Sequence, residues 1–208
     1  MKINSKAIKK SINCNVVEKL IVILHGYGAD GANFSEVANY FSTLIDNAVF
    51  ICPDAPFPCD MGFGRQWFPL KDEIAYEDLR EGLDLVGPIV CEYIEDLKKE
   101  YNCENVYLIG FSQGCMVSFE MLYHTKIAKI AACAGIFAAS NSHIVSNDCE
   151  VLIAHSDDDK VVDYEYAKLA KQNLNSLNIK SEILTLHNIG HSVSIEGWNA
   201  CMEFFKKD

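Results

Sequence analysis

The sequence lacks the patterns that mark a metal site, a secreted chain or a membrane span. It has nine cysteines, but no two of them have the C-x-x-C spacing of a zinc site, and we expect no metal ion. The start of the chain has no apolar segment typical of a signal peptide. The longest apolar run, residues 130–139, is too short to cross a bilayer, so we expect no integral membrane association.

Basic side chains are scarce as well. Lysine and arginine number 18 against 29 aspartates and glutamates, which gives a net charge of -11. Such a surface repels nucleic-acid phosphates and anionic membranes, so we expect neither as a direct partner. The cysteine count is odd, and cysteines such as Cys133 lie inside apolar runs, which is typical of free, buried thiols. We therefore predict a cytoplasmic location, where thiols stay reduced.

The chain does contain a regular alternation of strand and helix patterns. Residues 20–24 form a continuous apolar run, typical of a strand buried on both faces. Further strands are predicted at residues 48–52, 106–109, 151–154 and 182–186 and within 129–136. Apolar side chains at helical spacing occupy residues 33–46, 76–100, 113–123, 164–177 and 195–205. This order predicts an α/β fold in a single domain over residues 1–208, with a mostly parallel central sheet and helices on both faces. Gly87 and Pro88 lie in the middle of the longest helix, where we expect a kink or a break.

Polar residues and glycines follow four of these strands. The carboxyl ends of parallel strands meet at one edge of a sheet, and sites in such folds form there. The four stretches are His25-Gly26-Tyr27-Gly28, Phe111-Ser112-Gln113-Gly114, Ser156-Asp157-Asp158-Asp159 and His187-Asn188-Ile189-Gly190-His191. A serine, an acidic cluster and two histidines are thus predicted to lie close together.

One of these loops carries the pattern Gly110-Phe111-Ser112-Gln113-Gly114. G-x-S-x-G between a strand and a helix is the nucleophile elbow, a sharp turn that exposes the serine hydroxyl. A serine needs a histidine base that a carboxylate orients, and in this topology the acid and then the histidine follow the serine. His187 and His191 both follow the last strand, and we prefer His191 because it lies in the turn before the closing helix. The alternative interpretation is a glycine-rich turn with a solvent-exposed serine.

The acid and the oxyanion donors complete the predicted site. Residue chemistry leaves the acid open among the three consecutive aspartates at 157–159, while Asp163 is more simply a helix N-cap. Hydrolysis of an ester passes through an oxyanion, which two backbone N–H groups should hold. We predict these oxyanion-hole donors to be Gln113, the residue after the nucleophile, and Tyr27 in the early HGYG loop.

Six short motifs together carry a resemblance to a known family. They are LHGYGADG (24–31), PDAPFP (53–58), RQWF (65–68), GFSQGC (110–115), HSDDDKVV (155–162) and GHSVS (190–194). With them the chain resembles the α/β-hydrolase superfamily and, within it, the phospholipase/carboxylesterase family that includes the acyl-protein thioesterases. The resemblance covers nearly the whole chain. It implies an α/β-hydrolase fold with no large cap domain and no cofactor.

The same resemblance implies the catalytic residues, with Ser112 as nucleophile, His191 as base and Asp159 as acid. Family members carry the acid at the fifth position counted from the histidine that ends the strand, here His155. The chain departs from the family pattern at two points. The aspartates before Asp159 stand in a stretch that is usually less acidic, so Asp158 stays an alternative acid. The second departure is Lys160, at a position where many relatives have proline.

Four aromatic residues gather in the long loop 53–75, at positions 57, 63, 67 and 68. We predict that this loop forms a wall of the acyl pocket, with Phe63 and Trp67 as substrate-binding residues. The alternative is that the loop packs its own aromatic side chains onto the core. Cys115 lies behind Ser112 in an apolar segment and is expected to be structural.

These residues predict a serine hydrolase that cleaves esters of short- to medium-chain acyl groups through an acyl-enzyme. An acyl-protein thioesterase or a lysophospholipase acting on long acyl chains is the first alternative. A catalytically silent scaffold that only binds ligands or proteins is the second. The expected partner is an acyl ester or thioester substrate. Many enzymes with this fold pair up, so a homodimer is also open.

Overall fold

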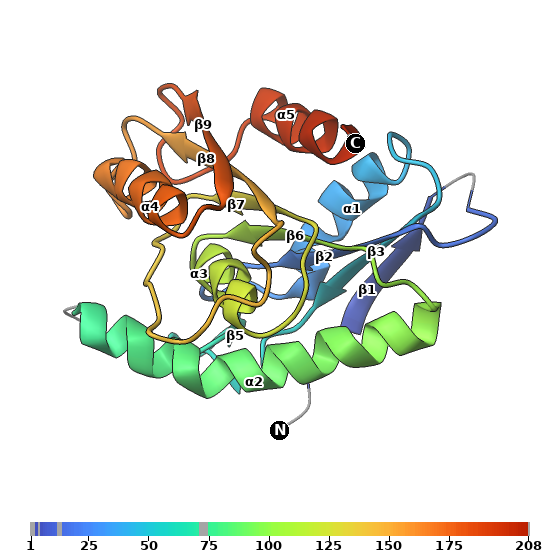
Figure 1. Ribbon diagram of the computed structural model, residues 1–208, viewed down its shortest axis with the longest axis horizontal. Helices are drawn as coiled ribbons and strands as arrows, with labels where there is room; N and C mark the ends of the chain where they lie inside the picture. Colours follow the sequence, from blue (N-terminus) through green and yellow to red (C-terminus); the bar gives the residue numbers. More distant parts are fainter. Residues whose placement is uncertain (1–2, 4, 12–13, 71–74, 208) are drawn as a thin grey trace.

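A seven-stranded sheet forms the centre of the protein, with the strand order β1-β3-β2-β6-β7-β8-β9 (Figure 1). The computed structural model describes residue 3 and residues 5–11, 14–70 and 75–207. β1 runs antiparallel to β3, and the other described pairings in this sheet are parallel. The prediction of a mostly parallel sheet is therefore confirmed. The strands are β1 (Ser5–Lys10), β2 (Lys19–Leu24), β3 (Ala48–Pro53), β6 (Val106–Phe111), β7 (Lys129–Cys133), β8 (Glu150–Ser156) and β9 (Lys180–Leu186).

Helices cover both faces of this sheet, as predicted. α1 and α5 pack on one face, whereas α2, α3 and α4 pack on the other (Figure 1). Side chains of one strand alternate between the two faces, so Ile21 and Ile23 contact the first layer while Leu20, Val22 and Leu24 contact the second. The helices are α1 (Ser35–Phe41), α2 (Tyr76–Tyr101), α3 (Gln113–Glu120), α4 (Glu165–Ser176) and α5 (Ile195–Lys206), with 3-10 turns η1 (Gly31–Phe34) and η2 (Met121–Tyr123).

Two elements differ from the prediction at the start of the chain. The sequence analysis missed β1, whose SKAIKK sequence has no apolar run. It lies at the edge of the sheet, where pairing with β3 and not burial of side chains holds a strand in place. The helix expected over residues 33–46 is shorter, because Asp30 caps the 3-10 turn η1 and α1 ends at Phe41.

The long helix α2 runs without a break through Gly87 and Pro88, so of the predicted kink or break the structure excludes the break. Proline removes one backbone hydrogen bond, here to the carbonyl of Asp84. Pro88 lies on the exposed side of the helix, where water can take over that bond, whereas Gly87 is buried. The opposite side is a buried apolar stripe that includes Leu83 and Val90, and this packing keeps the helix continuous.

The long loop over residues 53–75 contains a small hairpin of β4 (Phe57–Pro58) and β5 (Arg65–Gln66). Arg65 stabilises it by donating hydrogen bonds to the carbonyl oxygens of Ala55 and Pro56, at 2.8 and 2.7 Å. The part of this loop at residues 71–74 lies outside the described residues.

The cysteines are all free, and most of them are buried, as the sequence analysis predicts. Burial raises the pKa of Cys115 far above its usual range, so this thiol stays neutral next to Ser112 and fits the structural role expected of it. None of the described helices combines the length and the apolar content that crossing a bilayer requires.

Candidate active site

Ser112 lies in a sharp turn between β6 and α3, at the carboxyl edge of the sheet. Its φ of 53° and ψ of −115° are unusual for a residue with a side chain, a conformation that costs about 1–3 kcal/mol. The two glycines of the motif make this turn possible. A Cβ on Gly110 would lie 2.4 Å from the carbonyl oxygen of Gly114, and one on Gly114 would lie 2.1 Å from that of Leu24. The N–H of Ser112 donates to the carbonyl of Cys133 at 2.9 Å and fixes the turn to β7.

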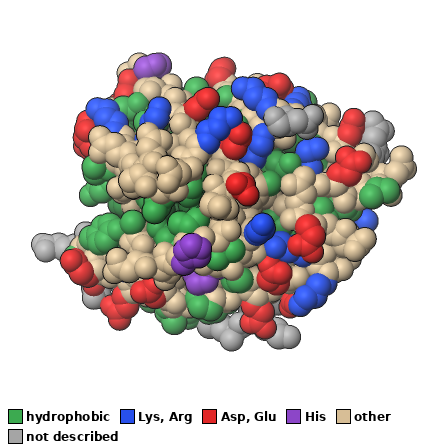
Figure 2. Space-filling model, in the orientation of Figure 1, with side chains coloured by type: hydrophobic (Ala, Val, Ile, Leu, Met, Phe, Trp, Pro, Cys, Tyr) green, Lys and Arg blue, Asp and Glu red, His purple; other side chains and the backbone are tan. Residues whose placement is uncertain are grey.

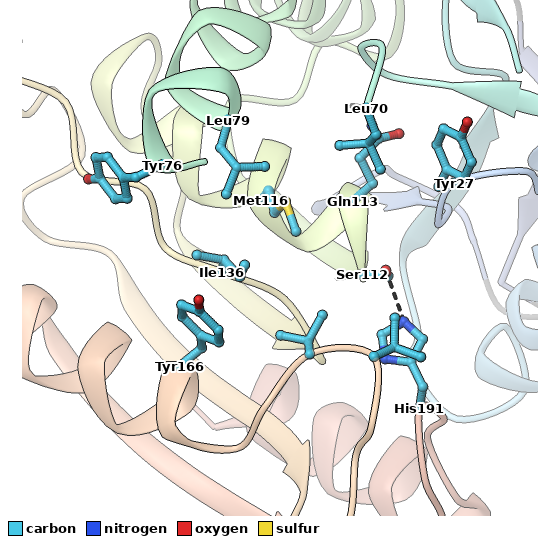
Figure 3. Close-up of a pocket in the computed structure, with 12 residues that line it drawn as sticks. Tyr27, Leu70, Tyr76, Leu79, Ser112, Gln113, Met116, Ile136, Tyr166 and His191 are labelled. Carbon is cyan, nitrogen blue, oxygen red and sulfur yellow. Dashed lines mark hydrogen bonds between the residues drawn. The ribbon is translucent and has the colours of Figure 1, made fainter. Parts of the chain in front are cut away.

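The side chains of Ser112, His191 and Asp159 form one chain of hydrogen bonds. Ser112 Oγ lies 3.0 Å from His191 Nε2 (Figure 3), and His191 Nδ1 lies 2.7 Å from Asp159 Oδ2. A carboxylate only accepts, so the Nδ1–H of His191 donates to Asp159 and its Nε2 can accept the serine proton. This is the arrangement in which a histidine activates a serine for attack on a carbonyl carbon.

Asp159 is held by more than its histidine. Its Oδ1 accepts hydrogen bonds from the N–H groups of Val161 and Val162, at 2.8 and 3.0 Å. Burial alone would raise the pKa of Asp159, but the hydrogen bonds from His191 and from these two N–H groups outweigh it, and the pKa lies below its usual value. Buried His155 supports the same turn, because its Nε2–H donates to the carbonyl of Val162 at 2.8 Å. The carboxylate is thus kept ionised and in one orientation.

The neighbouring aspartates have partners of their own, which answers the question that residue chemistry left open. Asp157 Oδ2 lies 2.6 Å from Nδ1 of the exposed His187. Asp158 Oδ1 accepts from the hydroxyl of Ser156 at 2.6 Å and from the N–H of Gly190 at 2.9 Å. Of the three consecutive aspartates, the structure brings Asp159 to His191.

Asp163, the fourth acidic candidate, lies at the start of α4. It precedes Tyr164, the N-cap of the helix, and does not occupy the predicted N-cap position itself; its Oδ1 accepts the N–H of Glu165, the first residue of α4, at 2.8 Å. Among the residues that the structure describes, no group of three His, Cys, Asp or Glu side chains is arranged to hold a metal ion.

The two predicted oxyanion donors lie beside Ser112, in the lining of the same pocket. Gln113 is the first residue of α3, and the first N–H groups of a helix have no partner within it. Its side chain is engaged elsewhere, since Oε1 accepts the N–H of Trp67 at 2.8 Å and Nε2 donates to the carbonyl of Phe68 at 2.7 Å. Gln113 and Tyr27 thus both line the pocket that contains Ser112.

His25 shapes the loop that carries Tyr27. The N–H of Ala55 donates to His25 Nε2 at 3.0 Å, so the imidazole proton lies on Nδ1, which donates to the carbonyl of Gly26 at 2.7 Å. Burial lowers the pKa of His25 and keeps the ring neutral in this role. His25 thus orients the loop that carries Tyr27.

The structure corrects the prediction for Trp67 and places Phe63 outside the pocket at Ser112. Trp67 is fully buried and donates its Nε1–H to the carbonyl of His25 at 2.8 Å, so it supports the HGYG loop and cannot contact a substrate. Phe63 is exposed and lies over Gly28. Neither is among the described residues that line the pocket at Ser112. The alternative interpretation holds for Trp67 and Phe68, because Phe68 packs against α2 where Gly82 leaves room for its ring.

The pocket at Ser112 has a volume of about 380 Å³ and mostly apolar walls (Figure 3). Hydrophobic side chains gather on the surface around it, between α4 and the first turns of α2 (Figure 2). None of the described lining residues carries a fixed charge. Leu70 belongs to the loop 53–75 that was predicted to form a wall of the pocket. The other lining residues without a predicted role are Tyr76, Leu79, Met116, Ile136, Val161, Val162 and Tyr166. Residues such as Leu79 belong to apolar helix stripes, and periodicity cannot tell a pocket wall from core packing.

Comparisons with known proteins place the chain in a family. The family model described as Phospholipase/Carboxylesterase matches residues 8–208. Acyl-protein thioesterase 1 homolog 1 of Dictyostelium discoideum is 27% identical over 203 residues, which covers 90% of this chain and 89% of the relative. Carboxylesterase SOBER1 of Arabidopsis thaliana is 28% identical over 202 residues, covering 86% and 88%. Esterase YpfH of Escherichia coli (strain K12) is 24% identical and covers 90% and 80%.

Solved structures agree with this assignment. The crystal structure of esterase PE8 is similar to this chain with a TM-score of 0.92 at 25% identity, and the match covers 99% of both chains. The chain belongs to the phospholipase/carboxylesterase family and has the α/β-hydrolase fold. By class it is a hydrolase of acyl esters or thioesters.

Proposed function

We propose that this chain is a serine carboxylesterase that cleaves esters of short- to medium-chain acyl groups through an acyl-enzyme. The observation that carries the proposal is the hydrogen-bonded chain from Ser112 through His191 to buried Asp159, at one end of an apolar pocket. The same chain argues against a scaffold that only binds, because a strained serine conformation is costly and is kept where the site uses it.

The chemistry follows from the geometry. Ser112 Oγ attacks the carbonyl carbon while His191 Nε2 takes its proton, and Asp159 stabilises the imidazolium that forms. The N–H groups of Gln113 and Tyr27 hold the negative oxygen of the tetrahedral intermediate. His191 then gives its proton to the leaving alcohol. Water repeats the sequence on the acyl-enzyme, and no step uses a cofactor.

The pocket supports the choice of acyl group. Its volume of about 380 Å³ is near the lower end of the roughly 300–1,000 Å³ typical of small-molecule sites. Its described lining residues include Leu79, Met116 and Ile136 and none with a fixed charge, which favours an uncharged, apolar acyl group of limited length.

An acyl-protein thioesterase is the second candidate. Relatives named acyl-protein thioesterase, such as those of Dictyostelium discoideum and Yarrowia lipolytica, favour it. The same residues would act on a thioester, because only the leaving group differs. A lysophospholipase stays the third candidate. The cytoplasmic location, the single-domain organisation and a homodimer stay predictions from the sequence.

The test is hydrolysis of a nitrophenyl ester series from acetyl to palmitoyl, with acyl thioesters of the same lengths. We expect the native chain to prefer esters with short or medium acyl groups, and Ser112→Ala to abolish turnover. A preference for palmitoyl thioesters would favour the second candidate. Turnover that survives in Ser112→Ala, with the variant shown to be folded by circular dichroism, would contradict the proposed nucleophile.

A further inference from the structure

Two cavities meet at one residue near the start of α2. The first is the apolar pocket at Ser112, and the second is a polar groove of about 810 Å³ between α2 and the segment after β7. Arg80, Glu81 and Asn141 are among the residues that line this groove. Of the described lining residues, Tyr76 is the one that belongs to both cavities. Its ring is therefore part of the partition between an apolar and a polar space.

Tyr76 is half-exposed, and two hydrogen bonds tie the first turn of the helix that carries it to the segment after β7. Tyr76 is the first residue of α2, and its hydroxyl donates to the carbonyl of Ala139 at 3.0 Å. One helical turn later, Arg80 Nη1 donates to the carbonyl of Ala138 at 2.8 Å. Side chains four residues apart lie on the same face of a helix, so the two bonds tie α2 to consecutive residues of the segment after β7.

Buried Glu120 in turn fixes Arg80. Arg80 Nη2 lies 2.5 Å from Glu120 Oε2, across the contact between α2 and α3. The contact between α2 and the segment after β7 is thus also supported from α3. It does not depend on the hydroxyl of Tyr76 alone.

Tyr76 lies at the end of the pocket farthest from the reacting atoms. In Figure 3 the side chains of Met116, Ile136 and Leu79 lie between Ser112 and Tyr76, and the hydroxyl of Tyr76 points away from the serine. An acyl chain bound to Ser112 would run along these apolar side chains. Its methyl end gains free energy from apolar contact and would lose it in the polar groove beyond.

We propose that Tyr76 determines the acyl chain length that this enzyme accepts, by closing the apolar pocket at its far end. The inference rests on the proposed function, since it names the substrate range of the same site. The substrate class is an ester of an uncharged aliphatic acid whose last carbon atoms pack against the Tyr76 ring. Longer chains are rejected because they meet this ring.

The test compares kcat/KM over nitrophenyl esters from acetyl to palmitoyl for the native chain and three variants of one residue. Tyr76→Ala joins the two cavities, and we expect the ratio of decanoyl to butyryl ester turnover to rise about 10-fold or more, the effect of accommodating added methylenes. Tyr76→Trp should shift the preference to shorter chains. Tyr76→Phe keeps the ring and should keep the native chain-length profile.

Tyr166→Ala is the matched control. Tyr166 is a half-exposed tyrosine on α4 that lines the same pocket, and it is not among the described residues of the polar groove. We expect this variant to give no selective gain for the longer esters. An equal gain in Tyr166→Ala would mean that widening the pocket anywhere has the same effect, and would overturn the role of Tyr76.

The outcomes separate this inference from the proposed function. If the native chain hydrolyses esters but Tyr76→Ala and Tyr76→Trp both keep its chain-length profile, the inference fails and the esterase stands. If the native chain hydrolyses none of the esters, the proposed function fails and the inference fails with it. Thermal unfolding of each variant shows whether it is folded, and Tyr76→Trp tests the inference even if Tyr76→Ala is unstable.

Discussion

Two aspartate–histidine pairs connect the same two loops of this protein, and they differ in their surroundings. Asp159 and His191 are 2.7 Å apart, and Asp157 and His187 are 2.6 Å apart. The side chains of the first pair are 0% and 19% exposed, whereas those of the second are 41% and 67% exposed. Of the two histidines, His191 reaches the hydroxyl of Ser112. A short carboxylate–imidazole distance is therefore not enough to bring a pair into contact with the serine.

Burial explains the difference. Water screens charges at the exposed pair, so its interaction contributes little and a change there is tolerated. At the buried pair the carboxylate also accepts the N–H groups of Val161 and Val162, which leaves it one orientation. The protein environment thus distinguishes two similar pairs, and of the two the buried one is hydrogen-bonded to Ser112.

The largest difference between the two pairs is expected when each histidine is removed in turn. We expect His191→Ala to lower kcat by as much as about 10⁶-fold, because a serine without its base is a poor nucleophile. His187→Ala should change kcat less than about threefold, since exposed substitutions away from the reacting atoms have small effects. Steady-state hydrolysis of a butyryl ester measures both. Equal losses in the two variants would show that the buried pair has no special role.

A smaller effect is expected from Asp158, which lies between the two acids and holds the loop that carries His191. Its Oδ1 accepts the N–H of Gly190, the residue next to the base. Asp158→Ala should lower kcat about 10-fold with little change in KM, because small errors in the position of a reacting group reduce the rate. Asp158→Asn keeps an acceptor oxygen and should restore most of the activity. A change in KM alone would contradict a positioning role and indicate contact with substrate.

The smallest effect concerns stability and its dependence on pH. The pKa of Asp159 is lowered in the folded protein, so its ionised form stabilises the fold above the unfolded value of about 3.9. That contribution is lost as the pH falls through the lower folded value. We expect the free energy of unfolding to be higher for the native chain than for Asp159→Asn at pH 7, with a smaller difference near pH 3. Urea titrations at both values measure this.

Asp157→Asn provides the matched control for the stability measurement. The pKa of Asp157 is also lowered, first by the hydrogen bond from His187, but this carboxylate is exposed. We expect its substitution to leave the unfolding free energy unchanged at pH 7. A loss as large as that of Asp159→Asn would show that burial does not separate the two pairs.

Much of the fold could be predicted because its signals are local. The run LIVIL reads as a buried strand, and β2 carries it with both faces covered. The strand β1 escaped prediction because backbone pairing at a sheet edge leaves no apolar pattern. Trp67 was misplaced for a related reason: composition shows that a loop is aromatic, but not whether a ring faces the core or the pocket.

By itself the sequence determined the alternation of strands and helices and the turn at Ser112. Both follow from short-range physics, since apolar runs form strands and Gly110 and Gly114 allow the elbow. Only the tertiary structure decided which aspartate is hydrogen-bonded to His191, and that Tyr76 lines the pocket at Ser112. Both depend on contacts between distant segments. The parallel register that pairs residues 155 and 156 of β8 with residues 185 and 186 of β9 sets the acid loop beside the histidine loop.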